Sequence, residues 1–418
     1  MHNELQETRV KRNIRVLAFY YQFGGMEINM LRVIWQPFVL SLGFPMTLLG
    51  LLESLANRRN GIVSTLAQLI GGAISDAIGR KPVIILSGVL TISAISLLTM
   101  AALTKAWSWL ILAAVLLSSA ALARPAYDAL TAESTEAGRR GVAYSIVLFS
   151  FITPGIYAGY LGGFIAENWG FPAVFLIGVL LESTGLVILV FFLRETLTHR
   201  TGDLMGGLSL FVKRIAPPRP VRGFFVATAV DAFVWGIGGS ILFGMVWKTY
   251  GFNPFQLGIM SSVFAASWAL TQLPIGKLVD RYGCKPFLAL SEVIGIFLMV
   301  GWLTLTSFEA FVLLQILFGF VASTWVPAML NFLASSVPEN ERAEALGKLA
   351  AFRGLIAFPA PWMGGYLFDL AGFTAPIAAN LLGATIALLT ILALVHEKPG
   401  VGTDKEIPAN ADDKPLRA

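Results

Sequence analysis

Several charged side chains lie inside long runs of apolar residues, and their types and positions suggest the chemistry they could perform. Glu27 and Arg32 share one such run, and Asp231 and Arg353 lie in two others. Where a run of this kind crosses a membrane, an ionisable side chain near the bilayer centre costs about 2.5 to 3.5 kcal/mol to insert. Such a group usually faces a water-filled cavity or pairs with an opposite charge. A carboxylate placed in this way could bind and release a proton, and an arginine could bind an anion.

The residue types that other chemistries need are missing from these runs. None of the three histidines, His2, His199 and His396, lies in an apolar run, so proton transfer there must use carboxylates. The sequence contains no metal-ligand cluster, nucleophile triad or phosphate-binding loop, and its single cysteine, Cys284, cannot form an internal disulfide. We therefore expect no enzyme activity, no metal and no cofactor, and the missing phosphate loop argues against an ATP-driven pump.

The apolar runs indicate a membrane protein. The 418-residue chain is 56% hydrophobic and 13% charged, whereas soluble domains are about half apolar and about a quarter charged. The runs are each long enough, as a helix, to cross a hydrocarbon core about 30 Å thick. They predict twelve transmembrane helices, near residues 14–41, 45–72, 82–103, 107–130, 141–166, 171–193, 222–247, 254–276, 286–306, 308–334, 343–368 and 374–396.

Lysine and arginine residues concentrate in alternate loops, on the side of the predicted membrane that also holds both termini. By the positive-inside rule this side is cytoplasmic, and the net charge of +5 reflects membrane orientation rather than nucleic-acid binding. The first apolar run is too long for a signal-peptide core, so we expect an uncleaved first helix. The chain is predicted to be a multi-pass protein of the plasma membrane with both termini in the cytoplasm.

The predicted helices form two sets of six, separated by a charged and proline-rich segment. We predict an N-terminal six-helix bundle at residues 1–193, a cytoplasmic linker at 194–221, a C-terminal bundle at 222–396 and a cytoplasmic tail at 397–418. Residues 208–215 of the linker could form a short amphipathic helix.

Short phrases recur in the two sets. "GGAISDAIGRKP" at residues 71–82 returns as "IGKLVDRYGCKP" at 275–286, about 204 residues later, and each copy follows the second helix of its set. "GGFIAENWGF" at 162–171 returns as "GGYLFDLAGF" at 364–373. The chain is therefore a duplicated half, and parallel six-helix halves related by an axis along the membrane normal are the architecture of one large class of transporters.

These two copies in a frame of twelve spans resemble the major facilitator superfamily, over nearly the whole chain. The signature of that family between helices 2 and 3 is G-x-x-x-D-(R/K)-x-G-R-(R/K). The first copy matches it at Gly72, Asp76, Gly79, Arg80 and Lys81, and the second at Gly276, Asp280, Arg281, Gly283 and Lys285. Ala77 and Cys284 depart from it at single positions.

Two further departures concern the drug/proton antiporters of the superfamily. These carry G-x-x-x-G-P-x-x-G-G in helix 5, where this chain reads "GIYAGYLGG". They also carry an arginine midway along helix 4, where Ala113 lies here. Both departures weaken the comparison with antiporters without favouring another subgroup.

The resemblance implies an all-α membrane fold in which two pseudo-symmetric six-helix bundles rock about a central site. It places Asp76 against the start of helix 11 and Asp280 against the start of helix 5, where an aspartate gains about 0.3 to 1 kcal/mol from the helix dipole. The expected cytoplasmic gate also includes Arg80, Lys81, Arg281, Lys285, Arg124 and Asp128. Alternatively, the residues of the repeated phrase only anchor loops at the lipid headgroups.

Helices 1, 4, 7 and 10 line the cavity in this family, so the resemblance makes Glu27 and Asp231 the leading candidates for proton binding or substrate contact. Each could instead be a buried acid paired with a nearby arginine. Further candidates for the site are Arg32, Arg58, Arg353, Trp235, Tyr20 and Tyr21. Glu182 and Glu292 fall on helices 6 and 9, which are peripheral in the family, and are expected to be structural.

The phrase "NRRN" at residues 57–60 makes helix 2 longer than its counterpart, helix 8. Because adjacent helical residues differ by about 100° around the axis, only one of Arg58 and Arg59 can point into the cavity. The other would pair, for example with Glu53, or extend toward the headgroups. A structural ion pair is the alternative to a substrate or gating role for Arg58.

The expected function is secondary active transport by alternating access, as proton-coupled efflux of amphiphilic small molecules, because aromatic residues in helices 1 and 7 suit planar or apolar ligands. One alternative is a symporter or uniporter for a small organic anion that the arginines bind. A second alternative is a non-transporting sensor or a lipid-handling protein. The expected partners are a small-molecule substrate, protons and the lipid bilayer, and the chain is expected to act as a monomer.

Overall fold

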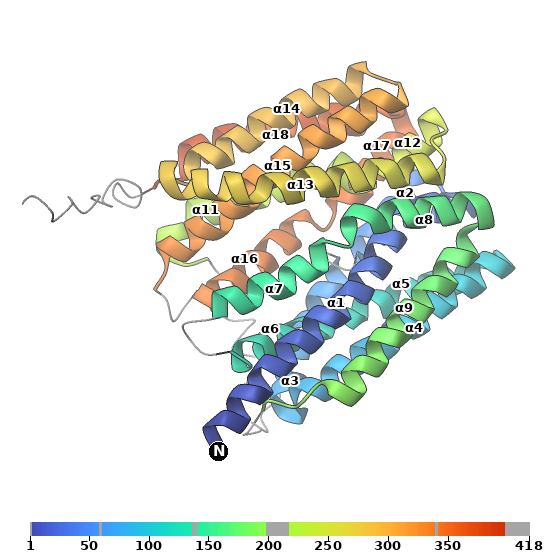
Figure 1. The fold of residues 1–418 in the computed structure, drawn as a ribbon. Coiled ribbons are helices and arrows are strands. Elements are labelled where there is room, and N and C mark those ends of the chain that lie inside the picture. Colours follow the sequence, from blue (N-terminus) through green and yellow to red (C-terminus); the bar gives the residue numbers. More distant parts are fainter. Residues whose placement is uncertain (1, 58–60, 136–139, 198–216, 339–341, 398–418) are drawn as a thin grey trace, which may run out of the picture.

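The computed structural model describes residues 2–57, 61–135, 140–197, 217–338 and 342–397. Every regular element in these ranges is a helix (Figure 1). The N-terminal half contains α1 (His2–Ser41), α2 (Met46–Ala56), α3 (Ile62–Ile78), α4 (Arg80–Thr104), α5 (Trp107–Ser119), η1 (Ala120–Ala123), α6 (Arg124–Glu133), α7 (Arg140–Ile152), α8 (Gly155–Trp169) and α9 (Phe171–Phe192).

The C-terminal half repeats the succession of six spans, although the interrupted spans are only partly the same. It contains η3 (Arg219–Val221), α11 (Arg222–Gly238), η4 (Gly239–Ile241), α12 (Leu242–Tyr250), α13 (Pro254–Tyr282), α14 (Lys285–Thr304), α15 (Phe308–Ser336), α16 (Arg342–Ala357), α17 (Ala360–Ala371) and α18 (Thr374–Leu394). In both halves these helices fall at the positions of the predicted spans. The boundaries predicted for linker and tail stay a prediction, and residues 208–215 lie outside the described residues.

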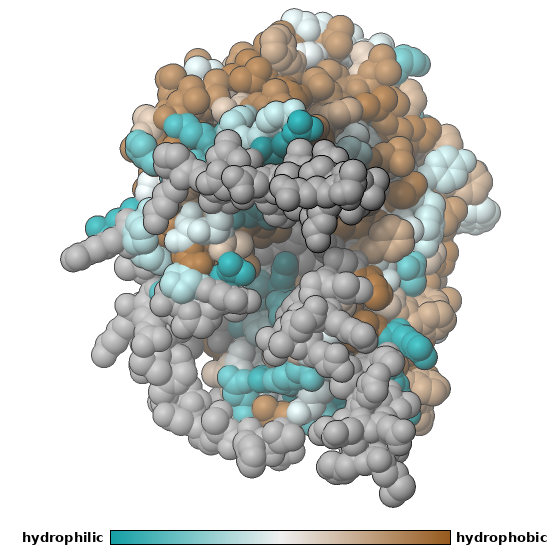
Figure 2. Space-filling view, turned by 60° about the vertical axis from the view of Figure 1, so that its left-hand side comes forward, coloured by the Kyte–Doolittle hydropathy of each residue, from teal (hydrophilic) through white to brown (hydrophobic). Residues whose placement is uncertain are grey.

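Eight helical segments in the described part of the chain are long and apolar enough to cross a membrane. The other predicted spans are α1, α2 with α3, α13, and α16 with α17, which are less apolar or are broken. In the view of Figure 2, apolar side chains cover the upper part and the right-hand flank, as expected of a surface that faces lipid, while hydrophilic ones gather in the middle and lower parts. The helices meet the main requirement of a membrane span, because every backbone polar group in lipid needs a hydrogen-bond partner within the protein.

Some predicted spans are broken rather than continuous. The span predicted at 45–72 consists of α2 and α3, because the backbone of Asn57 leaves the helix with an extended ψ of 127° and α3 starts only after Gly61. The spans containing α7 and α8, and α16 and α17, are interrupted just before Pro154 and Pro359 respectively. Proline lacks an N–H donor and clashes with the preceding turn, which explains both interruptions.

The duplication predicted from the sequence is visible in matched contacts. Ser87 on α4 donates its hydroxyl hydrogen to the Ala120 carbonyl at 2.7 Å, and Ser291 on α14 donates to the Val321 carbonyl at 3.0 Å. The two serines occupy the same place in the repeated sequence, six residues after Lys81 and Lys285. Each half therefore joins its third and fourth spans in the same way.

The two halves meet closely at one end of the molecule. We call the end that carries residues 79–81 and 283–285 the basic end, and the end that carries residues 42–45 and 251–253 the opposite end. Near the opposite end α2 packs on α17 and α8 packs on α13 (Figure 1). A Cβ atom at Gly50 would lie 2.2 Å from the Pro361 carbonyl oxygen, and one at Gly163 would lie 2.3 Å from the Pro254 carbonyl oxygen. Only glycine permits backbones to approach this closely.

Matched hydrogen bonds accompany these two helix pairs. The N–H of Trp362, near the start of α17, donates to Ser54 Oγ at 3.0 Å, and the N–H of Tyr160 on α8 donates to Ser262 Oγ at 2.9 Å. The bond from Trp362 satisfies an N–H in the first turn of α17 that has no partner within its own helix. The halves are thus joined by backbone contacts as well as by side-chain packing.

An additional contact at the opposite end involves Asp369 of α17. Its carboxylate accepts hydrogen bonds from the N–H groups of Met46 and Thr47 at 3.1 and 2.7 Å, and from the Thr47 hydroxyl at 2.7 Å. Lys248 of α12 lies 3.4 Å away. Pro45, the residue before α2, makes no capping hydrogen bond to this helix. A carboxylate from the other half caps the helix instead and complements its dipole.

We expect Asp369→Ala to open the opposite end, because removing an N-terminal cap costs about 0.5 to 2 kcal/mol. The measurement is the distance between spin labels on Ser41→Cys and Ala371→Cys, in a Cys284→Ser background, with a longer-distance population expected in the variant. Glu167→Ala is the matched control, since Glu167 occupies the same place in the repeated phrase of α8 and is exposed. Equal distance distributions in all three proteins would contradict the role of Asp369.

Candidate functional site

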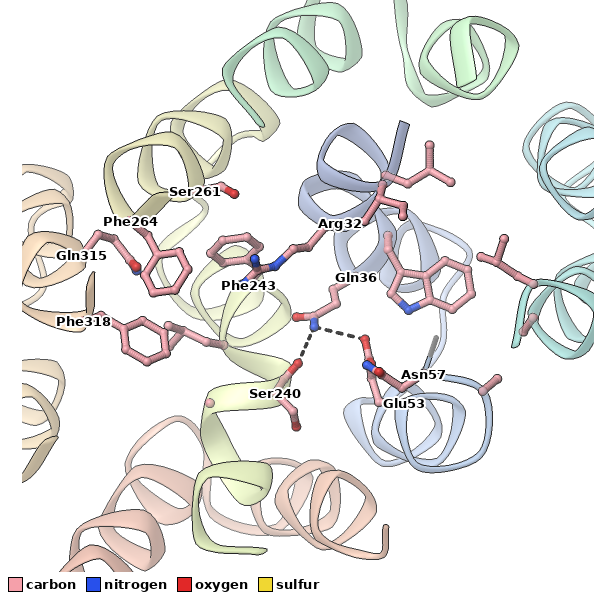
Figure 3. Close-up of a pocket in the computed structure, with 18 residues that line it drawn as sticks. Arg32, Gln36, Glu53, Asn57, Ser240, Phe243, Ser261, Phe264, Gln315 and Phe318 are labelled. Carbon is pink, nitrogen blue, oxygen red and sulfur yellow. Dashed lines mark hydrogen bonds between the residues drawn. The ribbon is translucent and has the colours of Figure 1, made fainter. Parts of the chain in front are cut away.

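A cavity of about 290 Å³ lies between the two halves. Residues of α1, α2 and α5 form one side, and residues of η4, α12, α13 and α15 form the other. Figure 3 shows the labelled side chains of these helices around a common space. The lining includes Arg32, Trp35, Gln36, Glu53, Asn57, Ser240, Phe243, Ser261, Phe264, Gln315 and Phe318. This combination of aromatic walls with a few polar groups is typical of small-molecule sites.

Gln36 joins the halves at the cavity. Its amide nitrogen donates to the Ser240 carbonyl at 2.6 Å and to Glu53 Oε1 at 3.2 Å (Figure 3), and its amide oxygen accepts from the Gly244 N–H at 2.8 Å. Gln36 therefore binds backbone groups of η4 and α12 directly and links α1 to the C-terminal half.

Glu53 places a carboxylate at the cavity wall. It lies on the last turn of α2, and the Asn57 amide donates to its Oε2 at 2.7 Å. The break between α2 and α3 follows immediately, so a helix end and its polar groups face the cavity. Interrupted spans of this kind are common at the binding sites of transporters.

Arg32 supplies the positive charge of the cavity. Its guanidinium carbon lies 5.4 Å from the centre of the Phe264 ring (Figure 3). Within the described residues, no carboxylate lies within salt-bridge distance of it, and the acid that acts on it electrostatically is Glu53. A cation held over an aromatic face, with its donors directed into a cavity, can bind the anionic part of a ligand.

The other acidic candidates lie outside the cavity lining. Glu27 is fully buried on α1, directly before Ile28, which is the first lining residue. Asp231 is buried on α11, where its Oδ2 accepts a hydrogen bond from Arg353 Nη2 at 3.0 Å. Trp235, one turn further along α11, stacks on Phe318 with ring centres 5.4 Å apart. The structure thus brings Asp231, Arg353 and Trp235 together beside the cavity.

The aromatic candidates of α1 lie in the N-terminal half. The Tyr20 hydroxyl donates to Glu182 Oε1 at 3.0 Å. Tyr20 stacks on Tyr127, and Tyr21 contacts the same ring. These residues support the packing of α1 against α6 and α9. Arg58 lies outside the described residues.

The residues expected at the gate make their contacts inside one half in this conformation. Arg80 forms an ion pair with Asp76 and a second one with Glu133 at 3.1 Å. Lys81 donates to the Val190 carbonyl and Lys285 to the Leu392 carbonyl, both at 2.8 Å.

In the C-terminal half, Asp280 accepts from the Asn331 amide at 2.7 Å, and Arg281 lies over Tyr282. Arg124 and Asp128 interact on α6. The proposed contacts of Asp76 and Asp280 with the other half stay a prediction.

Two glutamates that sequence reasoning did not single out secure the repeated phrases. Glu195 accepts from the N–H groups of Arg80 and Lys81 at 3.1 and 3.0 Å, and Glu397 accepts from those of Cys284 and Lys285 at 2.6 and 3.2 Å. Each therefore caps the helix that follows the phrase, from the chain segment that ends its half. A signal existed in the sequence, because a glutamate follows the last helix of each half at the same distance, three residues after Phe192 and three after Leu394.

The environment of Glu195 alters its acidity. Partial burial acts to raise the pKa of this carboxyl group, but hydrogen bonds from the N–H groups of Leu197, Lys81, Arg80 and Thr196 outweigh burial and hold the pKa below its ordinary value. A group with a lowered pKa in the folded state stabilises the protein above its unfolded pKa, and this contribution is lost as the pH falls through the folded value.

The geometry of the fold and the cavity defines a membrane-embedded, multi-pass carrier built from two similar halves. The model of the Major Facilitator Superfamily matches residues 17–249 and 224–417, and the chain belongs to this family. This confirms the resemblance to the family, the predicted all-α membrane fold and the expectation of a carrier rather than an enzyme.

Curated relatives and solved structures agree with this assignment. The chain is 25% identical over 317 residues to the "Multidrug resistance protein MdtG" of Salmonella typhi, covering 75% of this chain and 78% of that protein. It is similar in fold to the human organic anion transporter MFSD10 (TETRAN), with a TM-score of 0.65, 16% identity, and 91% and 99% of the two chains covered. For the D-xylose-proton symporter the TM-score is 0.67, the identity 17% and the coverage 94% and 98%.

We expect Glu195→Gln to lower the thermal midpoint of the purified protein at neutral pH, because the neutral amide is a weaker acceptor for the N–H groups that cap α4. The difference from the wild type should shrink as the pH is lowered and the wild-type carboxylate takes up a proton. Thermal unfolding at a series of pH values measures it, with Glu167→Gln as an exposed control. A difference that is constant with pH would rule out the capping carboxylate as its source.

Proposed function

We propose that the chain exports amphiphilic small molecules in exchange for protons, by alternating access through the central cavity. The observation that carries this proposal is the cavity itself, which lies between the halves, has aromatic walls, and includes both Arg32 and Glu53. The name of the relative MdtG, a multidrug resistance protein, supports the same substrate class. We further propose that the protein lies in the plasma membrane as a monomer, with the basic end and both termini in the cytoplasm.

The composition of the wall supports amphiphilic ligands. Phe264 and Phe318 contact one another, with ring centres 4.9 Å apart, and Trp35 and Phe243 add further aromatic surface. Flat apolar ligands gain affinity from such rings through burial and stacking. The polar groups are few, and they would fix the orientation of a ligand that carries one or two charges.

Alternating access is supported by the contacts between the halves. The opposite end is held by glycine-mediated packing and by Asp369, while α3 and α16 approach each other nearer the basic end. Export would require the opposite end to open while the duplicated phrases close the basic end. The interruptions at Pro154 and Pro359 would let the basic-end parts of those spans, α7 and α16, move separately from α8 and α17.

A second candidate function is transport of a small organic anion. Arg32 favours it, because its guanidinium faces the cavity without an ion pair in the part of the chain that the structure describes. A carboxylate or phosphate on a substrate would supply that missing partner. The two candidates therefore differ in the charge of the substrate that the cavity prefers.

The central test is dye transport by the purified protein in liposomes with an imposed pH gradient. We expect wild-type protein to accumulate a fluorescent aromatic cation such as ethidium, and Phe264→Ala to weaken this transport because the variant loses an aromatic wall. Phe297→Ala is the control, since Phe297 is 67% exposed on the lipid-facing side of α14. Transport that is equal in both variants would contradict the proposed position of the substrate.

Arg32→Gln separates the two candidate functions. If the cargo is an amphiphilic cation, we expect the variant to retain or improve ethidium transport, because removing a positive charge from the cavity lowers repulsion. If the cargo is an organic anion, the variant should lose uptake of an aromatic anion such as carboxyfluorescein. Parallel flux measurements with both dyes decide between these outcomes.

A further inference from the structure

Glu292 is a buried acid in the C-terminal half that the cavity does not explain. It lies on α14, its exposed fraction is 0%, and neither carboxyl oxygen has a hydrogen-bond partner of good geometry within the described residues. Its polar neighbours are the Asp231 carboxyl group and the Trp235 indole. A carboxylate without partners in a low-dielectric interior is strongly disfavoured, so this position calls for an explanation.

Arg353 is the basic group that is paired with one of these two acids, Asp231. It is bonded to Asp231, it also donates from Nε to the Thr228 carbonyl at 3.1 Å, and it lies over the Trp325 ring. Two further helices pack on α14. α18 contains no ionisable residue, and the acid of α15, Glu309, lies in its first turn at the opposite end. The described residues thus place two buried acids next to each other, with one partly buried arginine paired with Asp231.

The charges of this cluster determine what it can bind. With both acids ionised the cluster carries two negative charges and one positive charge, which leaves a net charge of minus one. One proton brings the net charge to zero, and burial favours the neutral form. We propose that Glu292 and Asp231 share one exchangeable proton, and that this cluster is the proton-binding site of the carrier.

The N-terminal half supports this assignment by contrast. The phrase "KPVIILSGVL" at residues 81–90 returns as "KPFLALSEVI" at 285–294, so Glu292 replaces Gly88. In the N-terminal half the nearby acid is Glu182 of α9, whose Oε2 and Oε1 lie 3.8 and 3.7 Å from the Cβ positions of Gly24 and Gly88. Glu182 receives a hydrogen bond from the Tyr20 hydroxyl. The two halves therefore differ in the hydrogen bonding of their buried acids: Glu182 accepts a hydrogen bond from Tyr20, whereas Glu292 has no such partner within the described residues.

Trp235 connects the cluster to the cavity. One edge of its indole lies against α14 at Gly295, where a Cβ would be only 2.8 Å from the ring. Its face stacks on Phe318, which lines the cavity and contacts Phe264. A change of charge at Glu292 would therefore act on the cavity wall through one rigid side chain. This coupling role rests on the proposed function, whereas proton binding by the cluster does not.

Infrared difference spectroscopy of the purified full-length protein tests proton binding directly. Titration with base should remove the carbonyl band of a buried protonated carboxyl group in the wild type. Glu292→Gln and Asp231→Asn should each lose this titrating band, and Glu182→Gln should retain it. A band that persists unchanged in Glu292→Gln and Asp231→Asn would overturn the proposal, and the second variant keeps the test valid if the first does not fold.

Transport measurements on the same proteins test coupling. We expect Glu292→Gln to lose ethidium accumulation driven by a pH gradient and to keep exchange of ethidium across the liposome membrane at equal pH. Accumulation at the wild-type rate would overturn the coupling role of the cluster. If wild-type protein moved neither ethidium nor carboxyfluorescein while the infrared result held, the proposed function would fail and the proton site would stand.

Discussion

The close approach of backbones between the two halves is the constraint on which the rest of the structure depends. Gly50 and Gly163 bring α2 against α17 and α8 against α13, with no room for a side chain at either crossing. In lipid, where apolar burial gives little drive for helices to associate, such small-residue contacts supply much of the attraction. They hold the opposite end together, and the next turns of the same helices line the cavity, with Glu53 of α2 and Ser261 of α13.

This arrangement separates the buried charges into two groups with different surroundings. Arg32 and Glu53 face the cavity, where water or a ligand can share their hydrogen bonds. Asp231, Glu292 and Arg353 lie within the C-terminal half, where protein alone must balance their charge. We propose that the first group selects the substrate and that the second group responds to protons, because a proton is small enough to reach a buried site and its positive charge offsets the negative charge there.

The fold could be predicted because the length of each apolar run and the repeated phrases can be read directly from the sequence. The sequence analysis also selected Asp231 and Arg353 as candidates for the site, and it offered an ion pair with an arginine as the alternative for Asp231. In the structure the two residues form an ion pair with each other. The sequence analysis did not identify Gln36 or Glu53 as site residues, since whether a helical residue faces the cavity depends on helix rotation and on the break at Asn57. Glu292 was expected to be structural because of its helix, although the change from Gly88 to an acid in a repeated phrase was a signal.

The break in the eleventh span would couple the proposed proton site to the proposed conformational change. Arg353 lies on α16, while α17 beyond Pro359 carries the packing on α2 and the Asp369 cap. Movement of α16 relative to α11 would therefore carry Arg353 away from Asp231 without disturbing the contacts at the opposite end. Once Arg353 withdraws, the two acids lose their shared positive charge, and each ionised carboxylate then needs a proton to remain buried. In this arrangement the position of α16 and the number of bound protons depend on one another.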